Sequence, residues 1–347
     1  MATRAARLLG VVLLAIGWAS ALGGAARGDV PPEPLRREGI HWPGEGGRRI
    51  EVSVGLYLVS FARINLREES FDMAGYLDTS WTDPGLALGP GEARKGLRRF
   101  RPGQIWAPAL EFVNAVEQVL TEREGDLYAD DAGRVTQRVR FAHKFQSPLE
   151  LKRFPFDAQT LTIVVAAFDP FARDLELRVD RGKVGRLDEA AVTDWDIVGV
   201  GARSQEVPNG DRFLFEMKVV RRPTFYVWRV LLPMTLLVVA SWTVFWFEPT
   251  NLQPQISTGL AILLSLVTFT YAIDFSLPKV AYLTFIDRYT LTSFAFVLAA
   301  IFVVAALHVL VRSWGLERAT RLQVRCRLAF PAAFVAAVLL AVASSFG

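Results

Sequence analysis

The sequence has few of the residues that build disulfides and metal sites. It contains one cysteine, Cys326, and three histidines, His41, His143 and His308, in 347 residues. A single cysteine excludes a disulfide within the chain. The histidines are scattered and lack the spacing of metal ligands. We therefore expect no metal site and no cofactor, and a folded domain that is stable without a disulfide.

A strong charge of one sign is also missing. The formal net charge of +4 at pH 7 is too small to indicate a nucleic acid partner. The charge-rich part of the sequence contains no nucleophile with a matching base, no metal cluster and no phosphate-binding loop. We predict that the protein is not an enzyme.

Apolar residues, by contrast, are abundant and unevenly distributed. They make up 52% of the chain, and the excess lies after residue 222. At the N-terminus, Arg4 and Arg7 precede a short apolar run and then small residues, as in a secretory signal peptide. An uncleaved membrane anchor is the alternative. The pattern predicts a signal peptide at 1–26, an extracytoplasmic domain at 27–222 and a membrane domain at 223–347.

Short stretches of alternating polar and apolar residues fill the extracytoplasmic domain. They occur at residues 51–57, 137–141, 174–179 and 213–217, and turn-forming Gly, Pro, Asn and Asp residues separate them. Many short strands with frequent turns and little helix predict an all-β, immunoglobulin-like antiparallel sandwich.

Four apolar segments long enough to span a bilayer follow the sandwich. Their approximate ranges are 225–247, 255–275, 280–312 and 325–345. An even number of spans places both termini on the outer side, so the connection between the third and fourth segments is cytoplasmic. That connection holds several arginines against Glu317, in agreement with the positive-inside rule. The arginines are Arg312, Arg318, Arg321, Arg325 and Arg327.

The second apolar segment carries a narrow, partly polar stripe. Its members recur every three or four residues and therefore share one face of a helix. They are Ser257, Ala261, Leu264, Thr268, Tyr271 and Phe275. A membrane helix usually turns such a face away from lipid. Two interpretations stay open: several copies around an axis would line a pore, whereas a single copy would bury the stripe in a helix bundle.

Six motifs give the chain a specific likeness to a known family. In order, they are WAPALEF at 106–112, FPFD at 154–157, WTVFW at 242–246, LLSL at 263–266, LPK at 277–279 and RCRLAFP at 325–331. With these motifs, residues 50–347 resemble a prokaryotic pentameric ligand-gated ion channel of the Cys-loop superfamily, most of all the bacterial channels opened by small primary amines. The disulfide that gives the superfamily its name would fall at Ser147 and Leu161, so it is absent.

The resemblance implies a homopentamer, in which each subunit meets four identical subunits around a central pore. The stripe would line this pore, with Ser257 as a cytoplasmic-side polar ring and Leu264 as a mid-pore hydrophobic gate. Tyr271 and Phe275 would narrow the outer half. The channel would lie among the lipids of a bacterial inner (plasma) membrane, with its large N-terminal domain outside the cytoplasm.

Two positions bear on ion selectivity. Gln253 stands at the cytoplasmic mouth, where cation-selective relatives usually carry an acid and anion channels a basic residue. Asp274 at the outer mouth would form a negative ring that attracts cations. We favour monovalent cations, with an anion-selective channel of the same fold as the alternative. A simpler interpretation of Asp274 is an interfacial carboxylate that is solvated by headgroup water or paired with Lys279.

The resemblance also implies where the two domains communicate. Asp157 would pair with Arg221 at the junction, and breaking a desolvated pair is costly. The other expected coupling residues are Phe154, Pro155, Phe156, Pro278 and Lys279. A pair that only holds the subunit together is the alternative.

An unknown small-molecule agonist would bind between subunits, in a box of aromatics with a carboxylate. The expected residues are Glu111, Asn114, Phe168, Asp169 and Phe213 on one subunit, and Tyr57 and Phe71 on its neighbour. Ala166 stands where the amine-gated pattern has a carboxylate, and loop 203–212 has no aromatic at its tip. Protons or another small molecule are therefore alternative stimuli. A membrane-anchored sensor that does not conduct is the main competing function.

Overall fold

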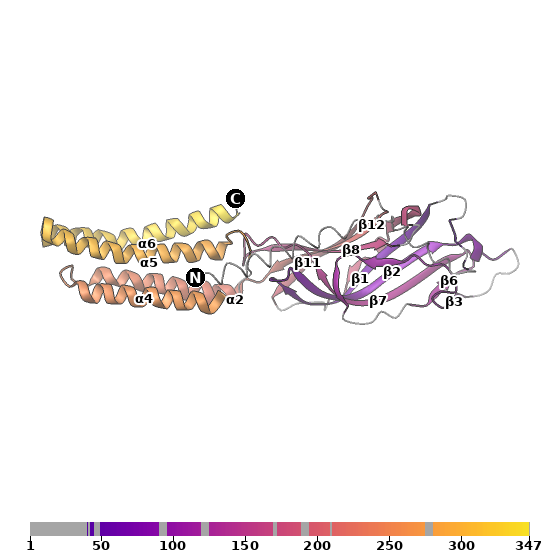
Figure 1. Ribbon diagram of the computed structural model, residues 1–347, viewed down its shortest axis with the longest axis horizontal. Coiled ribbons are helices and arrows are strands. Elements are labelled where there is room, and N and C mark those ends of the chain that lie inside the picture. Colours follow the sequence, from indigo (N-terminus) through magenta and orange to yellow (C-terminus); the bar gives the residue numbers. More distant parts are fainter. Residues whose placement is uncertain are drawn as a thin grey trace, which may run out of the picture. The chain divides into compact units, whose positions relative to one another are not determined.

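The computed structural model describes residues 40, 42–44, 49–89, 96–118, 125–168, 172–188, 194–208, 210–274 and 280–346 (Figure 1). The expected signal peptide at 1–26 lies outside these residues. Within the described parts, strands fill the first part of the chain and long helices the second. The division expected near residue 222 therefore agrees with the change from strand to helix.

The strands form two sheets. The first has the order β10-β1-β2-β7-β6-β3, with β9 paired to β1 and β5 paired to β7, and the second has the order β11-β12-β8-β4. The bounds are β1 Ile50–Asn65, β2 Ser70–Thr82, β3 Arg98–Phe100, β4 Leu110–Phe112, β5 Ala115–Gln118, β6 Leu127–Ala129, β7 Arg134–Gln146, β8 Ala158–Ala167, β9 Leu175–Val179, β10 Gly185–Arg186, β11 Trp195–Gln205 and β12 Arg212–Arg221. Three short 3-10 turns join strands: η1 Pro84–Leu86, η2 Ala172–Asp174 and η3 Arg181–Lys183.

Alternation along the strands explains the core between the sheets. In β1, Val52 and Val54 are fully buried while Glu51 is exposed. In β12, Phe213 and Phe215 are fully buried and belong to the same core cluster as the β1 valines. Successive side chains of a strand point to opposite faces, so each sheet contributes one apolar face to the sandwich.

The loop that carries the namesake disulfide in the superfamily is closed here by hydrogen bonds. The Thr162 backbone N–H donates to Ser147 Oγ at 3.4 Å, next to the buried Leu161. Asn114 Nδ2 donates to the backbone carbonyls of Gln146 and Thr162 at 2.7 and 2.8 Å. A side-chain amide therefore joins the two ends of this loop.

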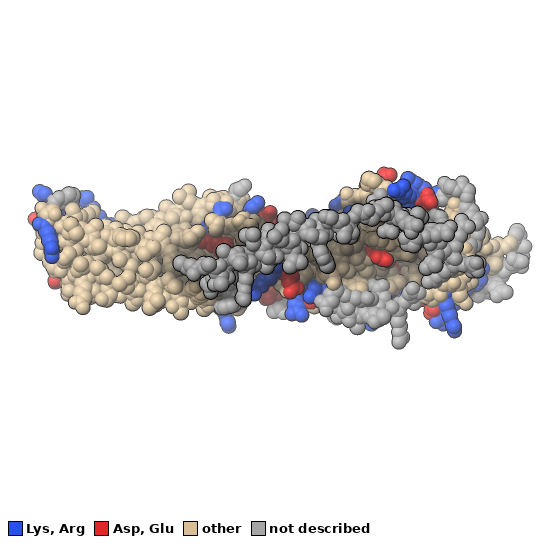
Figure 2. Space-filling model, viewed as in Figure 1, with Lys and Arg blue, Asp and Glu red and all other residues tan. Residues whose placement is uncertain are grey.

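Among the residues that the structure describes, four helical segments are long and apolar enough to cross a membrane. The first is composite: α2 Thr224–Tyr226, the π turn η4 Val227–Leu231, α3 Leu232–Ser241 and the 3-10 turn η5 Trp242–Trp246. The others are α4 Leu252–Asp274, α5 Phe285–Trp314 and α6 Leu316–Phe346. The π turn ends two residues before Pro233, whose missing N–H cannot support a regular helical bond. Figure 2 shows few charged side chains along these helices.

Two predicted helix boundaries are wrong. The third span begins at Phe285 and not at 280. Thr284 and Asp287 form a capping box at this start. The fourth begins at Leu316, not at 325, so Gly315, with φ of 84°, stands between α5 and α6. A hydropathy criterion detects only the apolar part of a helix, and the first turns of α6 are rich in arginine.

Candidate functional site

The stripe on α4 is exposed in the folded chain. Ser257, Ala261 and Thr268 are exposed, and Leu264 and Tyr271 are 66% and 74% exposed. The Thr268 hydroxyl donates to the Leu264 backbone carbonyl at 2.9 Å, which satisfies it without a partner from another helix. Phe275, the sixth predicted member, lies outside the described residues.

The opposite face of α4 is the one that packs within the subunit. Gln255, Gly259 and Leu266 are buried there, and α4 contacts α3 and α5. At Gly259 the backbone approaches α5 so closely that a Cβ would lie 2.6 Å from Cγ1 of Ile301. The alternative in which one subunit buries the stripe in its own bundle is therefore wrong, because its own helices leave the stripe uncovered.

The two ends of α4 carry the residues expected to govern selectivity. Gln253, in the first turn, is exposed. Asp274 is the last residue of the helix, and its side chain is outside what the structure describes. Glu248, between η5 and α4, is also exposed. Sequence analysis missed Glu248, although an acid close before α4 is a visible signal.

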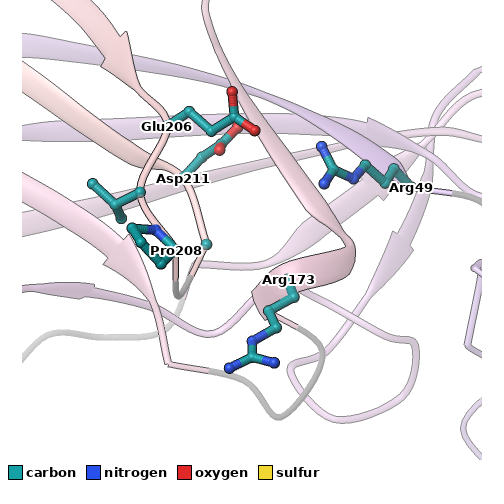
Figure 3. A pocket seen from close by; sticks show the side chains of 7 residues that line it. Arg49, Arg173, Glu206, Pro208 and Asp211 are labelled. Atoms are coloured by element: carbon teal, nitrogen blue, oxygen red, sulfur yellow. The ribbon is translucent and has the colours of Figure 1, made fainter.

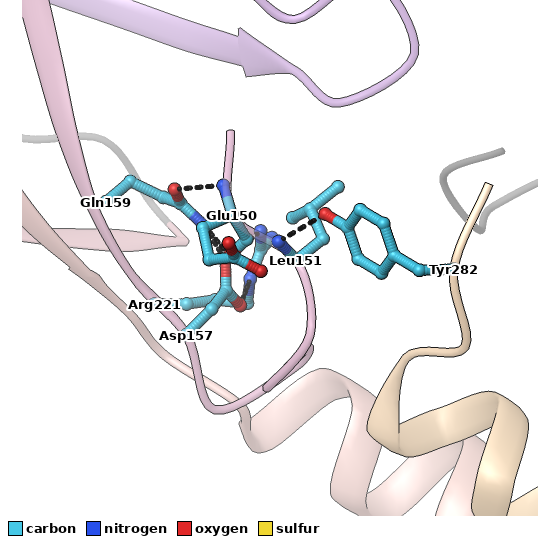
Figure 4. Close-up of polar contacts among 6 residues, drawn as sticks. All are labelled: Glu150, Leu151, Asp157, Gln159, Arg221 and Tyr282. Carbon is cyan, nitrogen blue, oxygen red and sulfur yellow. Dashed lines mark hydrogen bonds and ion pairs between the residues drawn. The ribbon is translucent and has the colours of Figure 1, made fainter. Parts of the chain in front are cut away.

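The expected junction pair is formed by a buried carboxylate and guanidinium. Arg221 Nε and Nη2 donate to Asp157 Oδ1 and Oδ2 at 2.7 and 3.1 Å, and the two side chains are 3% and 1% exposed (Figure 4). Gln159 Nε2 donates to Asp157 Oδ2 at 2.7 Å. The Arg221 guanidinium also lies over the rings of Trp195 and Phe154, 4.0 and 4.8 Å from their centroids. The Asp157 carboxylate therefore accepts hydrogen bonds from both Arg221 and Gln159, and the Arg221 guanidinium contacts aromatic rings as well as the carboxylate.

The loop that supplies Asp157 touches three helical elements. The Leu151 N–H donates to the Tyr282 hydroxyl at 2.9 Å, just before α5 (Figure 4). Phe156 contacts Phe285 and Phe346 with centroids 5.6 and 6.3 Å apart. The ring centroids of Phe154 and Tyr226 of α2 lie 4.7 Å apart. Pro155 separates Phe154 from Phe156 in the sequence. The loop thus meets the start of the first span, the start of α5 and the end of α6. Pro278 and Lys279 lie outside the described residues.

Two residues expected to bind an agonist are core residues instead. Phe71 is 2% exposed and stacks on Phe145, and Phe213 is fully buried. The strand alternation points both rings into the sandwich, where a ligand at the surface cannot touch them. These two assignments are corrected accordingly.

Two further residues have structural partners. Asn114 uses its amide nitrogen as described above, and its Oδ1 accepts from the Val164 N–H at 2.9 Å. The Tyr57 hydroxyl donates to the Arg186 carbonyl at 3.0 Å. These polar groups therefore have partners within the sandwich.

Glu111 and Phe168 remain accessible. Glu111 is exposed on β4 and pairs across the sheet with Ala166 of β8, while Phe168 is 62% exposed just after β8. Paired residues project from the same face of a sheet. The Glu111 carboxylate therefore lies beside the position where the amine-gated pattern has its acid. Asp169 lies outside the described residues.

A cavity of about 410 Å³ lies at one end of the sandwich, and sequence analysis did not find it (Figure 3). Its charged lining residues are Arg49, Arg173, Glu206 and Asp211. Strand register brings them together, because Ile50 pairs with Leu175 and Gln205 pairs with Arg212. Asp211 Oδ2 accepts from the Leu177 N–H at 3.1 Å, which ties the β11–β12 hairpin to β9.

Comparison with known families gives two matches that together cover most of the chain. The neurotransmitter-gated ion-channel ligand binding domain matches residues 40–219. The neurotransmitter-gated ion-channel transmembrane region matches residues 230–335. The chain belongs to the neurotransmitter-gated ion-channel family. The recognition of a prokaryotic channel of the Cys-loop type and the expected fold class, a sandwich followed by four apolar helices, are confirmed. The likeness to amine-gated channels in particular stays a prediction.

Individual members of this family align over most of the chain. A proton-gated ion channel of Gloeobacter violaceus is 28% identical over 323 residues, which cover 91% of this chain and 86% of the relative. A gamma-aminobutyric acid receptor subunit beta-like protein of Drosophila melanogaster is 25% identical over 77% of this chain and 58% of its own length. The gamma-aminobutyric acid receptor subunit rho-2 of Bos taurus is 26% identical over 80% of this chain and 63% of its own length. The chain is therefore a ligand-gated ion channel of the Cys-loop family, whose members are channels and not enzymes.

Proposed function

We propose that the protein is a homopentameric, cation-selective ligand-gated channel of a bacterial inner membrane, with its sandwich outside the cytoplasm. The exposed stripe on α4 carries the proposal. Its polar and aromatic members alternate with Leu264 on one face that the subunit's own helices leave uncovered. Five such faces around an axis would enclose water, with lipid contacting only the outer helices.

The gate of this pore is a ring of five Leu264 side chains. A hydrophobic constriction stops ions because water leaves it and an ion cannot shed its hydration shell there. Thr268 and Ser257 lie one and two turns away on the same face and keep the remaining pore polar. A slight outward tilt of α4 would rewet the ring and permit conduction.

Acidic residues at the two ends of α4 support cation selectivity. Asp274 ends the helix on the outer side, and the exposed Glu248 precedes it on the cytoplasmic side. Rings of carboxylates raise the local concentration of cations. An anion-selective channel is the alternative, since Gln253 itself is neutral. Reversal potentials in asymmetric salt distinguish the two, and replacing Glu248 by Gln is expected to weaken the preference for cations.

Protons are the first candidate stimulus, because the Gloeobacter relative is named as a proton-gated channel. A small-molecule agonist is the second, and two observations favour it. Glu111 and Phe168 offer a carboxylate and an exposed aromatic ring for a cationic group. The cavity lined by Arg49 and Glu206 presents charges of both signs.

Opening would pass from the sandwich to α4 through the junction. The buried pair of Asp157 and Arg221 joins the 149–157 loop to the end of β12, which leads directly into the first span. Separating the pair would leave a buried charge without its partner, which costs several kcal/mol. The two residues would therefore move together and transmit displacement of the sandwich to the first span.

The proposal is tested by recording current from the purified full-length chain in a planar bilayer. The pH on the sandwich side is lowered first, and small primary amines are then added at neutral pH. We expect cation current in at least one arm and a mass of five chains by native mass spectrometry. A monomer, or a silent bilayer in every arm, would support the non-conducting sensor.

A further inference from the structure

The first membrane span ends in a turn whose backbone carbonyls need partners. The 3-10 turn η5 closes at Trp246, and extended backbone follows at Phe247. The last carbonyls of a helix have no partner within the helix. Near a membrane they must find donors from elsewhere in the protein.

Donors from α6 reach two of these carbonyls. Gln323 Nε2 donates to the carbonyls of Phe245 and Phe247 at 2.9 and 2.7 Å. One turn further along α6, Arg327 Nε donates to the Phe245 carbonyl at 3.0 Å, and its guanidinium lies 5.3 Å from the ring centroid of Trp246.

A donor from α4 reaches the same turn. Gln255 Nε2 lies 3.3 Å from each of the carbonyl oxygens of Val244, Phe247 and Glu248. Gln255 and Gln323 are 2% and 1% exposed. The Phe247 carbonyl therefore accepts from both α4 and α6. We call Gln255, Gln323 and Arg327 the carbonyl clasp.

The carbonyl clasp lies where α4 begins. Gln255 is two residues after Gln253 and two before Ser257, and those two neighbours are exposed on the opposite face. Fixing Gln255 to the end of the first span therefore fixes the position of the predicted cytoplasmic mouth. The neutral amides can be fully buried at this depth, where an unpaired charge would be far more costly.

We propose that Gln323, on α6, is a positioning residue for the cytoplasmic mouth of the pore. It acts through the Phe247 carbonyl that it shares with Gln255. The inference rests on the proposed pore function of α4. Simple capping of a helix end would predict an effect on stability alone, whereas positioning also predicts an effect on gating and on access to Gln253.

The test compares Gln323→Met, which keeps the length of the side chain and removes both donors, with Arg321→Gln on the exposed side of α6. Within the described part of the chain, Arg321 makes a solvent-exposed i,i+4 pair with Glu317 at 3.7 Å and no other ion pair. We expect Gln323→Met to shift the open–closed equilibrium constant by about 2- to 30-fold and Arg321→Gln to leave it unchanged. Unchanged gating in a folded Gln323→Met channel overturns the inference.

A readout without current separates this inference from the proposed function. Cys326 is the sole native cysteine, so Gln253→Cys in a Cys326→Ser background offers one reactive thiol. We expect Gln323→Met to change the rate at which a water-soluble cationic thiol reagent modifies residue 253, measured by mass spectrometry. An unchanged rate overturns the inference, whether or not the wild-type chain conducts.

A milder variant covers the case in which Gln323→Met does not assemble. Arg327 is only half-buried, and Arg327→Lys keeps its charge while losing the Nε donor to Phe245. We expect a change of the same direction and smaller size in both readouts. Wild-type behaviour of this variant contradicts a role for the carbonyl clasp in positioning.

Discussion

The first membrane span is held at both ends, but by different chemistry. At its outer end a charged pair, Asp157 with Arg221, is buried among aromatic rings. At its other end the neutral amides of Gln255 and Gln323 hold backbone carbonyls. A charged pair is strong only while both partners stay together, whereas amide–carbonyl bonds are individually weaker. The outer end is therefore suited to transmit force, and the inner end to set a position.

Breaking the outer pair tests this comparison most strongly. We expect Arg221→Ala to destabilise the folded chain by about 3–5 kcal/mol, because the buried Asp157 carboxylate loses its partner. Thermal or denaturant unfolding of the purified protein measures the loss. Arg222→Ala is the matched control, since the neighbouring arginine is exposed and pairs with the exposed Asp196. Equal effects of the two substitutions would contradict the importance of burial.

Removing the amide that supports the outer pair sharpens the comparison. Gln159 Nε2 also donates to the Glu150 carbonyl at 2.8 Å, and its Oε1 accepts from the Glu150 N–H at 3.0 Å. We expect Gln159→Met to cost about 1–3 kcal/mol of unfolding free energy, the range for leaving buried polar groups unsatisfied. A loss as large as that of Arg221→Ala would mean that the loop, not the ion pair, dominates the junction.

The proposed gate, Leu264, lies on α4 and can be tested separately from the two ends of the first span. We expect Leu264→Thr to open at about tenfold weaker stimulus, an energy of about 1.4 kcal/mol, because a polar ring holds water. Stimulus–response curves from bilayer recordings give the shift. Leu260→Thr is the control, because Leu260 is exposed on α4 beside the stripe. If both variants shift equally, Leu264 has no special place in the gate.

The smallest effect is expected at the exposed pair beside the junction. The hydrogen bond from Arg222 lowers the pKa of Asp196. The contribution of this ion pair to folding stability is therefore present above the unfolded-state pKa of Asp, about 3.9, and is lost as the pH falls through the lower folded-state pKa of Asp196. Asp196→Asn should leave activation by mild acid unchanged in pH–response recordings. A shifted response would make Asp196 part of the proton sensor.

Sequence patterns predicted the parts of the molecule that depend on local periodicity. The stripe on α4 is visible in the sequence because its members recur every three or four residues. The alternation in β1 is visible because residues of one face recur every two residues. Phe71 and Phe213 show how the same rule was overlooked: Phe213 alternates with Phe215 and Met217, all buried, which already indicates the core face. Placing these residues in an agonist site followed the resemblance instead of the alternation.

Features that depend on distant contacts were not predicted. Gln255 and Gln323 stand among other polar residues, such as Gln253 and Arg321, so the sequence does not single them out, and the carbonyls that they bind belong to another span. The cavity at Arg49 and Glu206 combines strands that are far apart in the sequence. The start of α6 at Leu316 was missed because its arginines lower the hydropathy while leaving helix formation unaffected.

The central claim is that Leu264 side chains face water across a pore. It is tested most directly by Leu264→Cys in the Cys326→Ser background, with a bulky water-soluble thiol reagent applied while the channel is open. The account predicts that the reagent blocks the current irreversibly and leaves the current of the Cys326→Ser parent intact. Persistent current after the residue 264 thiol has been fully modified would contradict it.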